Sequence, residues 1–242
     1  PGHVAAYRGA LALLAPYHRR LEQDDRPEWM RARTIHAAGV GIAPADFPTR
    51  REARAALGID AATDVVVALG GGGGEGLPSA ALSLGARGEP SARWFTLGAV
   101  ETPWHQTQPA NLTHLGWRSD VPLWLAAADR IVSTCGNTTV HEVAAFNAPW
   151  IAIPQWRYFD EQRCKAEVLA REGIASVAPD WPARVQDWAG LWERARAFDP
   201  AARRGLVDPD AAEAAVAEIE LVLARGWGSA PLAPSIGAEA AA

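Results

Sequence analysis

The sequence predicts an α/β protein built on a doubly wound parallel sheet, and three observations support this fold class. Short apolar runs alternate with amphipathic stretches along most of the chain. Two of the apolar runs end in loops of glycine or small polar residues directly before a helical stretch. The 242 residues are 49% hydrophobic, which is enough for one globular domain and at most a fraction of a second.

Six apolar runs predict six strands, and the stretches around them predict helices. The strands are expected at residues 64–69, 93–97, 111–115, 130–133, 150–153 and 174–177. The helices are expected at about 77–87, 121–128, 137–147, 160–172, 183–197 and 210–225. Repeated strand–helix–strand units connect in a right-handed sense and give a Rossmann-like sheet, which binds ligands at the carboxyl ends of its strands.

Glycine and proline residues around position 44 mark a domain boundary. Residues 1–44 hold about one helix and one or two short strands, too little for a core, so we expect them to be the remnant of an amino-terminal domain. Residues 45–227 form the predicted ligand-binding domain. Residues 228–242 are rich in alanine, proline and serine and are expected to be a disordered tail. Because the sequence opens without methionine, we expect that part of the protein precedes it.

Composition excludes several classes of protein. With 28 acidic and 23 basic side chains the net charge is -5, which argues against nucleic acid as a partner. No apolar run is long enough for a transmembrane segment, although peripheral membrane contact stays open. Two cysteines, Cys135 and Cys164, are too few for a disulfide framework, so a cytoplasmic protein is expected.

The first candidate site is a run of five glycines, Gly70–Gly74, between a strand and a helix. Without side chains, backbone N–H groups and the helix N-terminus can approach a phosphate closely. A flexible turn is the alternative. Gly71, Gly73 and Gly76 also fit the dinucleotide pattern GxGxxG, which would suit a nicotinamide-dependent oxidoreductase, but the acidic ribose ligand expected about 20 residues later is not evident.

The second candidate site opens the helix expected at 137–147. Gly136, Thr138 and Thr139 offer N–H groups and hydroxyls to an anion at a strand's carboxyl end. Glu142 follows Thr138 by four positions and lies on the same helical face, within reach of a ribose. Capping by Asn137 or Thr138 is the alternative. His141 is turned about 100° away from Glu142, so a packing role is expected for it.

The third candidate site is the polar start of the helix expected at 160–172. Asp160, Glu161 and Gln162 follow a strand end and a loop, which would place them beside the same crevice. Alternatively, Asp160 is a helix cap and Glu161 a favourable first-turn charge.

These motifs resemble the donor-binding, carboxyl-terminal half of GT-B glycosyltransferases. The resemblance rests on Cys135-Gly136, Glu142, Ala148-Pro149, Pro154 and Phe159-Asp-Glu-Gln162, and covers about residues 45–225. It is strongest to the bacterial family that adds N-acetylglucosamine to a lipid-linked muramyl precursor, with macrolide and plant UDP-sugar transferases related more distantly. The sequence departs from these relatives in Gly72–Gly74, Asn147 and Thr134.

The resemblance implies a UDP-sugar donor and assigns a role to each candidate residue. The diphosphate would lie on Gly71, Gly72, Gly73, Gly74, Gly136, Thr138 and Thr139. Glu142 would hold the ribose, and Asp160, Glu161 and Gln162 the sugar. The base would lie on Trp117, Arg118 and Val121.

The resemblance also implies that an amino-terminal domain supplies the acceptor site and the general base, so this chain would bind donor without turnover unless another chain completes it. No cofactor and no metal are expected, because Asp208-Pro-Asp210 precedes a helix as ordinary capping residues do. A UDP-sugar 2-epimerase of the same fold and a non-catalytic nucleotide-binding module remain alternatives.

Overall fold

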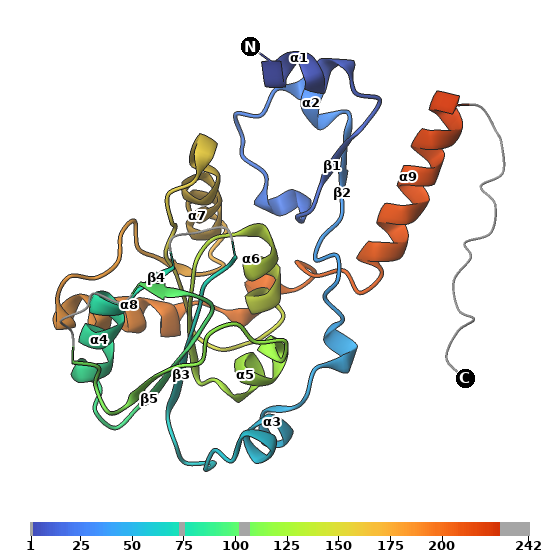
Figure 1. Ribbon diagram of the computed structural model, residues 1–242. Helices are drawn as coiled ribbons and strands as arrows, with labels where there is room; N and C mark the ends of the chain where they lie inside the picture. Colours follow the sequence, from blue (N-terminus) through green and yellow to red (C-terminus); the bar gives the residue numbers. More distant parts are fainter. Residues whose placement is uncertain (1, 73–75, 102–106, 228–242) are drawn as a thin grey trace, which may run out of the picture.

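The computed structural model describes residues 2–72, 76–101 and 107–227, and its centre is a six-stranded parallel sheet (Figure 1). Its strands are β3 (Val65–Leu69), β5 (Arg93–Leu97), β7 (Leu112–His114), β8 (Arg130–Ser133), β9 (Trp150–Ala152) and β10 (Ser176–Val177). The order across the sheet is β7-β5-β3-β8-β9-β10. This is the doubly wound Rossmann order, in which the chain starts in the middle and builds outwards in both directions.

Two apolar layers cover the sheet, because side chains along a strand alternate between its faces. On one face, Val65 and Val67 of β3 pack with helices α5 (Val121–Ala127), α6 (Asn137–Ala144) and α7 (Glu161–Arg171). On the other face, Val66 packs with α4 (Ser79–Gly88) and α8 (Val185–Ala197). Three tryptophans fill this second layer: Trp94, Trp188 and Trp192.

The structure confirms the predicted α/β class, and every predicted strand and helix has a counterpart. Several boundaries differ by one to three residues, and two of these differences lie close to the glycine and threonine loops. Residues Leu77–Pro78 form a short strand, β4, which pairs with β6 (Val100–Glu101), so α4 begins at Ser79. Helix α6 ends at Ala144 rather than 147, with Ala145 at its C-cap.

Helix α3 (Arg50–Leu57) was not predicted, although the sequence carries its signals. Thr49 caps its N-terminus, and the carboxylate of Glu52 accepts the backbone N–H of Thr49, which completes a capping box. Gly58 ends the helix in the left-handed conformation, with φ of 63°. The buried guanidinium of Arg54 fixes α3 to the sheet domain by donating to the carbonyl oxygens of Ala127 and Thr63.

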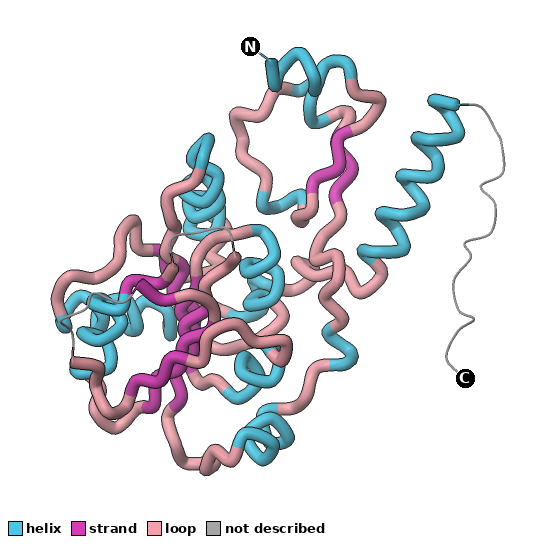
Figure 2. Tube along the Cα trace, in the orientation of Figure 1, coloured by secondary structure: helices cyan, strands magenta, loops and turns pink. Residues whose placement is uncertain are grey.

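The amino-terminal segment consists of short elements: α1 (Gly2–Gly9), β1 (Leu13–Ala15), η1 (Arg19–Leu21), α2 (Glu28–Arg31), β2 (Thr34–His36) and η2 (Pro44–Asp46). Strands β1 and β2 pair in parallel as a separate two-stranded sheet. Figure 2 shows how much of this segment is loop. It is tied to the sheet domain through Arg20, whose guanidinium donates to the carbonyl oxygen of Ala202 in η4 (Pro200–Arg203).

The last helix, α9 (Ala211–Trp227), leaves the sheet domain and lies against β2 (Figure 1). It therefore belongs spatially with the amino-terminal segment. The tail expected to be disordered, residues 228–242, lies outside the described residues. Within the described part of the chain, no helix is long and apolar enough to cross a membrane.

Candidate functional site

The centre of the candidate site is the point where the sheet reverses its direction of growth, between β3 and β8. These strands are neighbours, with Leu69 beside Ser133 in register, and the N–H of Thr134 donates to the carbonyl oxygen of Leu69 over 3.1 Å. Both strands end at the same edge of the sheet. Ligands of doubly wound sheets bind in the crevice at such a switch point.

The glycine loop after β3 is shaped by close backbone contacts. The N–H of Gly70 donates to the carbonyl oxygen of Leu97, and Gly98 donates to that of Gly116. Gly98 has φ of +97°, and a Cβ built there would lie 2.4 Å from the carbonyl oxygen of Gly70. Only glycine fits at position 98. Of the four phosphate ligands predicted in this loop, the structure describes Gly71 and Gly72, while Gly73 and Gly74 lie outside the described residues.

The N-terminus of α6 faces this loop. Gly136 is its N-cap and no side chain caps it, so the alternative in which Asn137 or Thr138 caps the helix is wrong. Thr138 is exposed and Thr139 is buried. A Cβ at Gly71 would lie 3.4 Å from the hydroxyl of Thr139, which places the two predicted phosphate loops in contact.

Together these elements line a crevice of about 320 Å³. Its walls include the predicted residues Gly71, Gly72, Trp117, Arg118, Val121, Thr138, Thr139 and Glu142. A Cβ at Gly72 would come within 3.3 Å of the exposed indole ring of Trp117. Arg118 donates to both carboxylate oxygens of Asp120, over 2.7 and 2.6 Å, which fixes its guanidinium at the rim. Leu97 and Gly98 also line the crevice, although sequence reasoning did not single them out.

Glu142 is the carboxylate of the crevice. Among the described residues it has no hydrogen-bond or ion-pair partner, and burial raises its pKa to about 7. Glu142 is half-buried, and a carboxylate partly removed from water without a donor destabilises the ligand-free chain. Such a group is expected where a ligand supplies the missing hydrogen-bond donors.

The third predicted group lies apart from this crevice. The amide oxygen of Gln162 is buried and accepts the N–H groups of Cys135 (3.0 Å) and Gln155 (2.9 Å), which leaves only its amide nitrogen for a ligand. Glu161 accepts a hydrogen bond from the side chain of Asn137 over 3.2 Å. Asp160 occupies the N-cap position of α7 and Glu161 lies in its first turn, as the alternative predicts, although the side chain of Asp160 makes no capping hydrogen bond.

The loop before α7 has a strained backbone. Phe159 and Asp160 have φ of 63° and 54°, and they are the described non-glycine residues with positive φ. The aromatic side chains of Trp156 and Tyr158 contact each other edge to face and are exposed. Strain of this kind persists only where the surroundings hold it, and it is concentrated at ligand sites.

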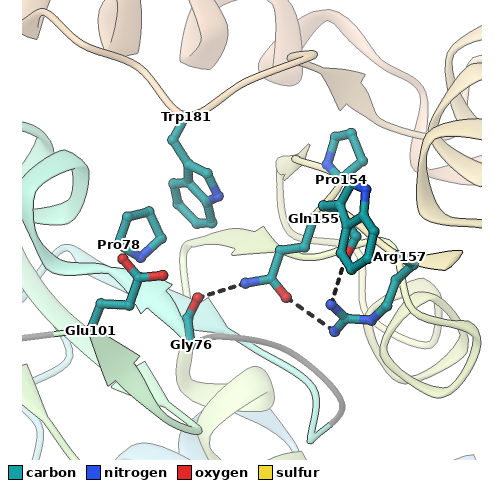
Figure 3. Close-up of a pocket in the computed structure, with 8 residues that line it drawn as sticks. Gly76, Pro78, Glu101, Pro154, Gln155, Arg157 and Trp181 are labelled. Atoms are coloured by element: carbon teal, nitrogen blue, oxygen red, sulfur yellow. Dashed lines mark hydrogen bonds between the residues drawn. The ribbon is translucent and has the colours of Figure 1, made fainter. Parts of the chain in front are cut away.

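A second, smaller hollow of about 190 Å³ lies on one side of this loop (Figure 3). Gln155 spans it and donates to the carbonyl oxygen of Gly76 over 2.6 Å, while Arg157 donates to the side chain of Gln155. Trp181 and Pro78 line the hollow opposite Arg157. Gln155 thus connects the loop to the end of the glycine run, a role that no sequence motif indicates.

His141 has a structural role. It is buried, its Nδ1–H donates to the carbonyl oxygen of Asn137 over 2.7 Å, and its Nε2 accepts the N–H of His18 over 3.1 Å. Burial lowers its pKa to about 4, so it is neutral at physiological pH. The packing role predicted for it is confirmed.

Within the described ranges, no cluster of three or more His, Cys, Asp or Glu residues could hold a metal ion. Asp208 of the Asp-Pro-Asp motif accepts the N–H of Asp210 over 3.0 Å, which is ordinary turn chemistry before α9. Both cysteines are free thiols, and burial raises the pKa of Cys135 to about 12.

Comparison with curated proteins finds transferases of one kind. Over 152 residues the chain is 31% identical to UDP-N-acetylglucosamine--N-acetylmuramyl-(pentapeptide) pyrophosphoryl-undecaprenol N-acetylglucosamine transferase of Yersinia pestis (strain Pestoides F). The match covers 59% of this chain and 42% of that enzyme. The same enzyme from Yersinia pestis bv. Antiqua (strain Angola) matches equally. The chain thus spans less than half the length of these relatives. No protein-family model matches the chain.

Solved structures share the fold. MurG of Acinetobacter baumannii superposes with a TM-score of 0.54 at 18% identity, over 90% of this chain and 62% of its own. A spinosyn rhamnosyltransferase complexed with thymidine diphosphate gives 0.58 at 18% identity, over 90% and 60% of the two chains. The calicheamicin glycosyltransferase CalG4 gives 0.58 at 17% identity, over 92% and 56%.

The sheet and its helices therefore have the fold of a GT-B glycosyltransferase domain. Over the matched segment the chain is a homologue of the N-acetylglucosamine transferases named above. The predicted resemblance is confirmed at this level.

Proposed function

We propose that this chain is the donor-binding part of a glycosyltransferase, a hexosyltransferase that takes a UDP-sugar and transfers the sugar to an acceptor hydroxyl. One observation carries the proposal. The switch-point crevice joins a glycine loop, an uncapped helix N-terminus and a half-buried carboxylate that has no partner among the described residues.

The diphosphate lies between the glycine loop and α6 in this proposal. The N–H groups at the start of α6 have no side-chain cap, and the positive end of the helix dipole favours an anion there. Thr138 adds an exposed hydroxyl, and Gly71 approaches Thr139 closely enough for both loops to contact one phosphate group. These fixed dipoles take the place of a cation, so no metal is required.

The nucleoside extends from the diphosphate along the crevice. Glu142 accepts the two ribose hydroxyls, which supply the hydrogen bonds that its carboxylate lacks in the free chain. Trp117 and Val121 line the place for the uracil ring, with Arg118 held at the rim by Asp120.

The sugar extends toward the start of α7, to Asp160, Glu161 and the amide nitrogen of Gln162. A new bond forms between the acceptor oxygen and the anomeric carbon. The bond from that carbon to the diphosphate oxygen breaks, and its electron pair leaves with UDP. The acceptor proton passes to a general base that we assign to an amino-terminal domain, in the same polypeptide or in a separate chain. We assign the reaction to the cytoplasm, in keeping with two free thiols.

The alternatives explain less of the site. A 2-epimerase would also bind a nucleotide sugar, but the relatives reported above are glycosyltransferases. A nicotinamide-binding domain would use the glycine loop and leave Glu142 unexplained. A non-catalytic nucleotide-binding module would bind UDP equally well, so only reconstitution with an acceptor domain separates it from the transferase.

Calorimetry with UDP and UDP-N-acetylglucosamine tests the proposal. Glu142→Gln should weaken UDP by about 1.5–3 kcal/mol, as expected for hydrogen bonds to an ionised group. Glu193→Gln, an exposed carboxylate on α8, is the matched control and should bind UDP like the wild type. A wild-type chain that binds no UDP, or a Glu142→Gln variant with unchanged affinity, contradicts the proposal.

A further inference from the structure

The largest described cavity lies outside the donor crevice. It has a volume of about 620 Å³ and separates the amino-terminal segment from the start of α7. This volume is within the range of small-molecule sites, about 300–1,000 Å³. Asn137 and Glu161 line it, and they are hydrogen-bonded to each other at the starts of α6 and α7. The cavity therefore adjoins the place proposed for the donor sugar.

Specific hydrogen bonds hold the two walls of the cavity together. The ammonium group of Lys165 on α7 donates to the carbonyl oxygen of Leu21 over 3.2 Å and lies 3.7 Å from the ring centroid of Tyr17. Arg171, also on α7, pairs with Asp24 over 2.7 Å. The cavity is thus built by contacts between segments far apart in sequence, and it is not a gap between unconnected parts.

The charges of the cavity are unsuited to an anionic ligand. Three carboxylates line it: Glu22, Asp25 and Glu161. Two cationic side chains, Arg26 and Lys165, line it, and both have partners within the chain, while burial lowers the pKa of Lys165 to about 8. Arg26 pairs with Glu22 and donates to the hydroxyl of Tyr17, while Lys165 is held by Leu21 and Tyr17. Among the described lining residues, carboxylates outnumber these two cations, and each cation already contacts protein groups, which disfavours a phosphate.

The remaining walls suit an apolar ring. Tyr17, Leu21 and Met30 form the inner surface, and Tyr158 and Phe159 form an aromatic edge that is 76% and 82% exposed. Exposed aromatic side chains on a strained loop offer flat faces for stacking and edges for T-shaped contacts.

We infer that this cavity binds the acceptor of the proposed transfer, and that the acceptor is an uncharged, largely apolar ring compound bearing a hydroxyl group. The inference rests on the proposed function and adds the acceptor class to it. A phosphorylated acceptor, like the pyrophosphoryl lipid in the name of the curated relatives, would meet three carboxylates and two cations that already pair with protein groups.

A matched pair of fluorescent probes tests the charge preference in the full chain. We expect saturable one-to-one binding of 2-naphthol, and binding of 2-naphthyl phosphate that is weaker by at least about tenfold. Equal affinities, or a preference for the phosphate, would overturn the inference.

Cavity variants test the place of binding. Met30→Trp fills the cavity and should weaken 2-naphthol by about tenfold or more. Ala32→Trp is the control, since Ala32 is exposed and lies outside the lining. If Met30→Trp does not fold, Phe159→Asp and Phe159→Asn replace it as a charged and an uncharged variant that both remove the aromatic ring. Aspartate and asparagine tolerate the positive φ at position 159. Wild-type affinity in the folded Met30→Trp or in both Phe159 variants would contradict the assignment.

An NMR measurement separates this inference from the proposed function. With UDP-N-acetylglucosamine and 2-naphthol both bound, we expect interligand nuclear Overhauser effects between the naphthol ring and the sugar protons. Donor binding without any naphthol binding overturns the inference and leaves the proposed function standing. Naphthol binding without donor binding overturns the proposed function. Two bound ligands with no interligand effect refute the acceptor role.

Discussion

The imidazole of His141 accepts the backbone N–H of His18 over 3.1 Å, although the two residues are 123 positions apart. The same ring donates to the carbonyl oxygen of Asn137, one turn back on α6. A neutral imidazole with its proton on Nδ1 satisfies both contacts. This ring therefore fixes the amino-terminal segment to the helix that opens the proposed diphosphate site.

Because His141 is neutral in the folded chain, we expect the folded chain to lose stability at acid pH. Burial lowers the pKa of His141 to about 4, below its unfolded value of 6.5, so the unfolded chain binds the extra proton first. Stability should fall as the pH drops from about 6.5 to about 4, by up to about 3 kcal/mol from this residue. The lowered pKa values of His18 and His114, caused mainly by burial, act in the same direction. Urea unfolding from pH 7.5 to 4.5 measures this, and His141→Leu should show a shallower slope.

We expect Glu142 to lower the stability of the ligand-free chain at high pH and to strengthen the binding of UDP. Because burial raises its pKa to about 7, its stabilising contribution is complete below pH 4.5 and is lost as the pH rises through about 7. Glu142→Gln should therefore raise the melting temperature of the ligand-free chain at pH 8 while weakening UDP. Differential scanning fluorimetry at pH 5 and 8 checks the sign. A melting temperature lowered by the substitution at pH 8 would mean that the carboxylate has a structural partner.

Gly98→Ala should distort the glycine loop. The new Cβ would lie 2.4 Å from the carbonyl oxygen of Gly70, and φ of +97° is strained for alanine. We expect a loss of about 3 kcal/mol or more of unfolding free energy and weaker UDP binding. Gly116→Ala is the matched control, with φ of +68° and open space around its Cβ. Similar losses in both variants would show that backbone strain alone is responsible.

Arg203→Met should be strongly destabilising. The guanidinium of Arg203 is buried and donates to the carbonyl oxygens of Ile174, Phe146 and Ala148. Removing it leaves three carbonyl groups without a partner, at a cost of about 3 kcal/mol or more. The exposed neighbour Arg204→Met should change stability by less than about 0.5 kcal/mol. Equilibrium urea unfolding of both variants makes the comparison.

Donor binding should be independent of divalent metal. The proposed diphosphate site uses N–H groups and hydroxyls at the start of α6 in place of a cation. UDP affinity should be the same within error in EDTA and in magnesium chloride. Loss of binding on chelation, restored by magnesium, would show that the phosphates bind as a metal complex.

The sheet could be predicted because its strands are continuous apolar runs and its helices are amphipathic. The grouping of Gly71, Thr139 and Glu142 followed from the rule that parallel strands end at one edge. Helix α3 was missed because only two of its eight residues, Ala53 and Arg54, are buried. The capping box of Thr49 and Glu52 was the signal that could have found it.

Contacts between distant segments could not be predicted. Nothing local to Lys165 indicates that it donates to Leu21, and nothing near Gln162 indicates its bonds to two backbone N–H groups. Both contacts depend on how the amino-terminal segment and the loop before α7 pack on the sheet. The cavity proposed for the acceptor depends on the same packing.

The amide oxygen of Gln162 holds two chain segments together. It accepts the N–H of Cys135, where β8 leads into α6, and the N–H of Gln155, which begins the loop of residues 155–159 before α7. A donor sugar that recruited this oxygen would have to release both N–H groups inside a buried site. In the proposed donor site, sugar hydroxyls that accept from the amide nitrogen would leave both bonds in place, so residues 155–159 would keep their position while the sugar binds.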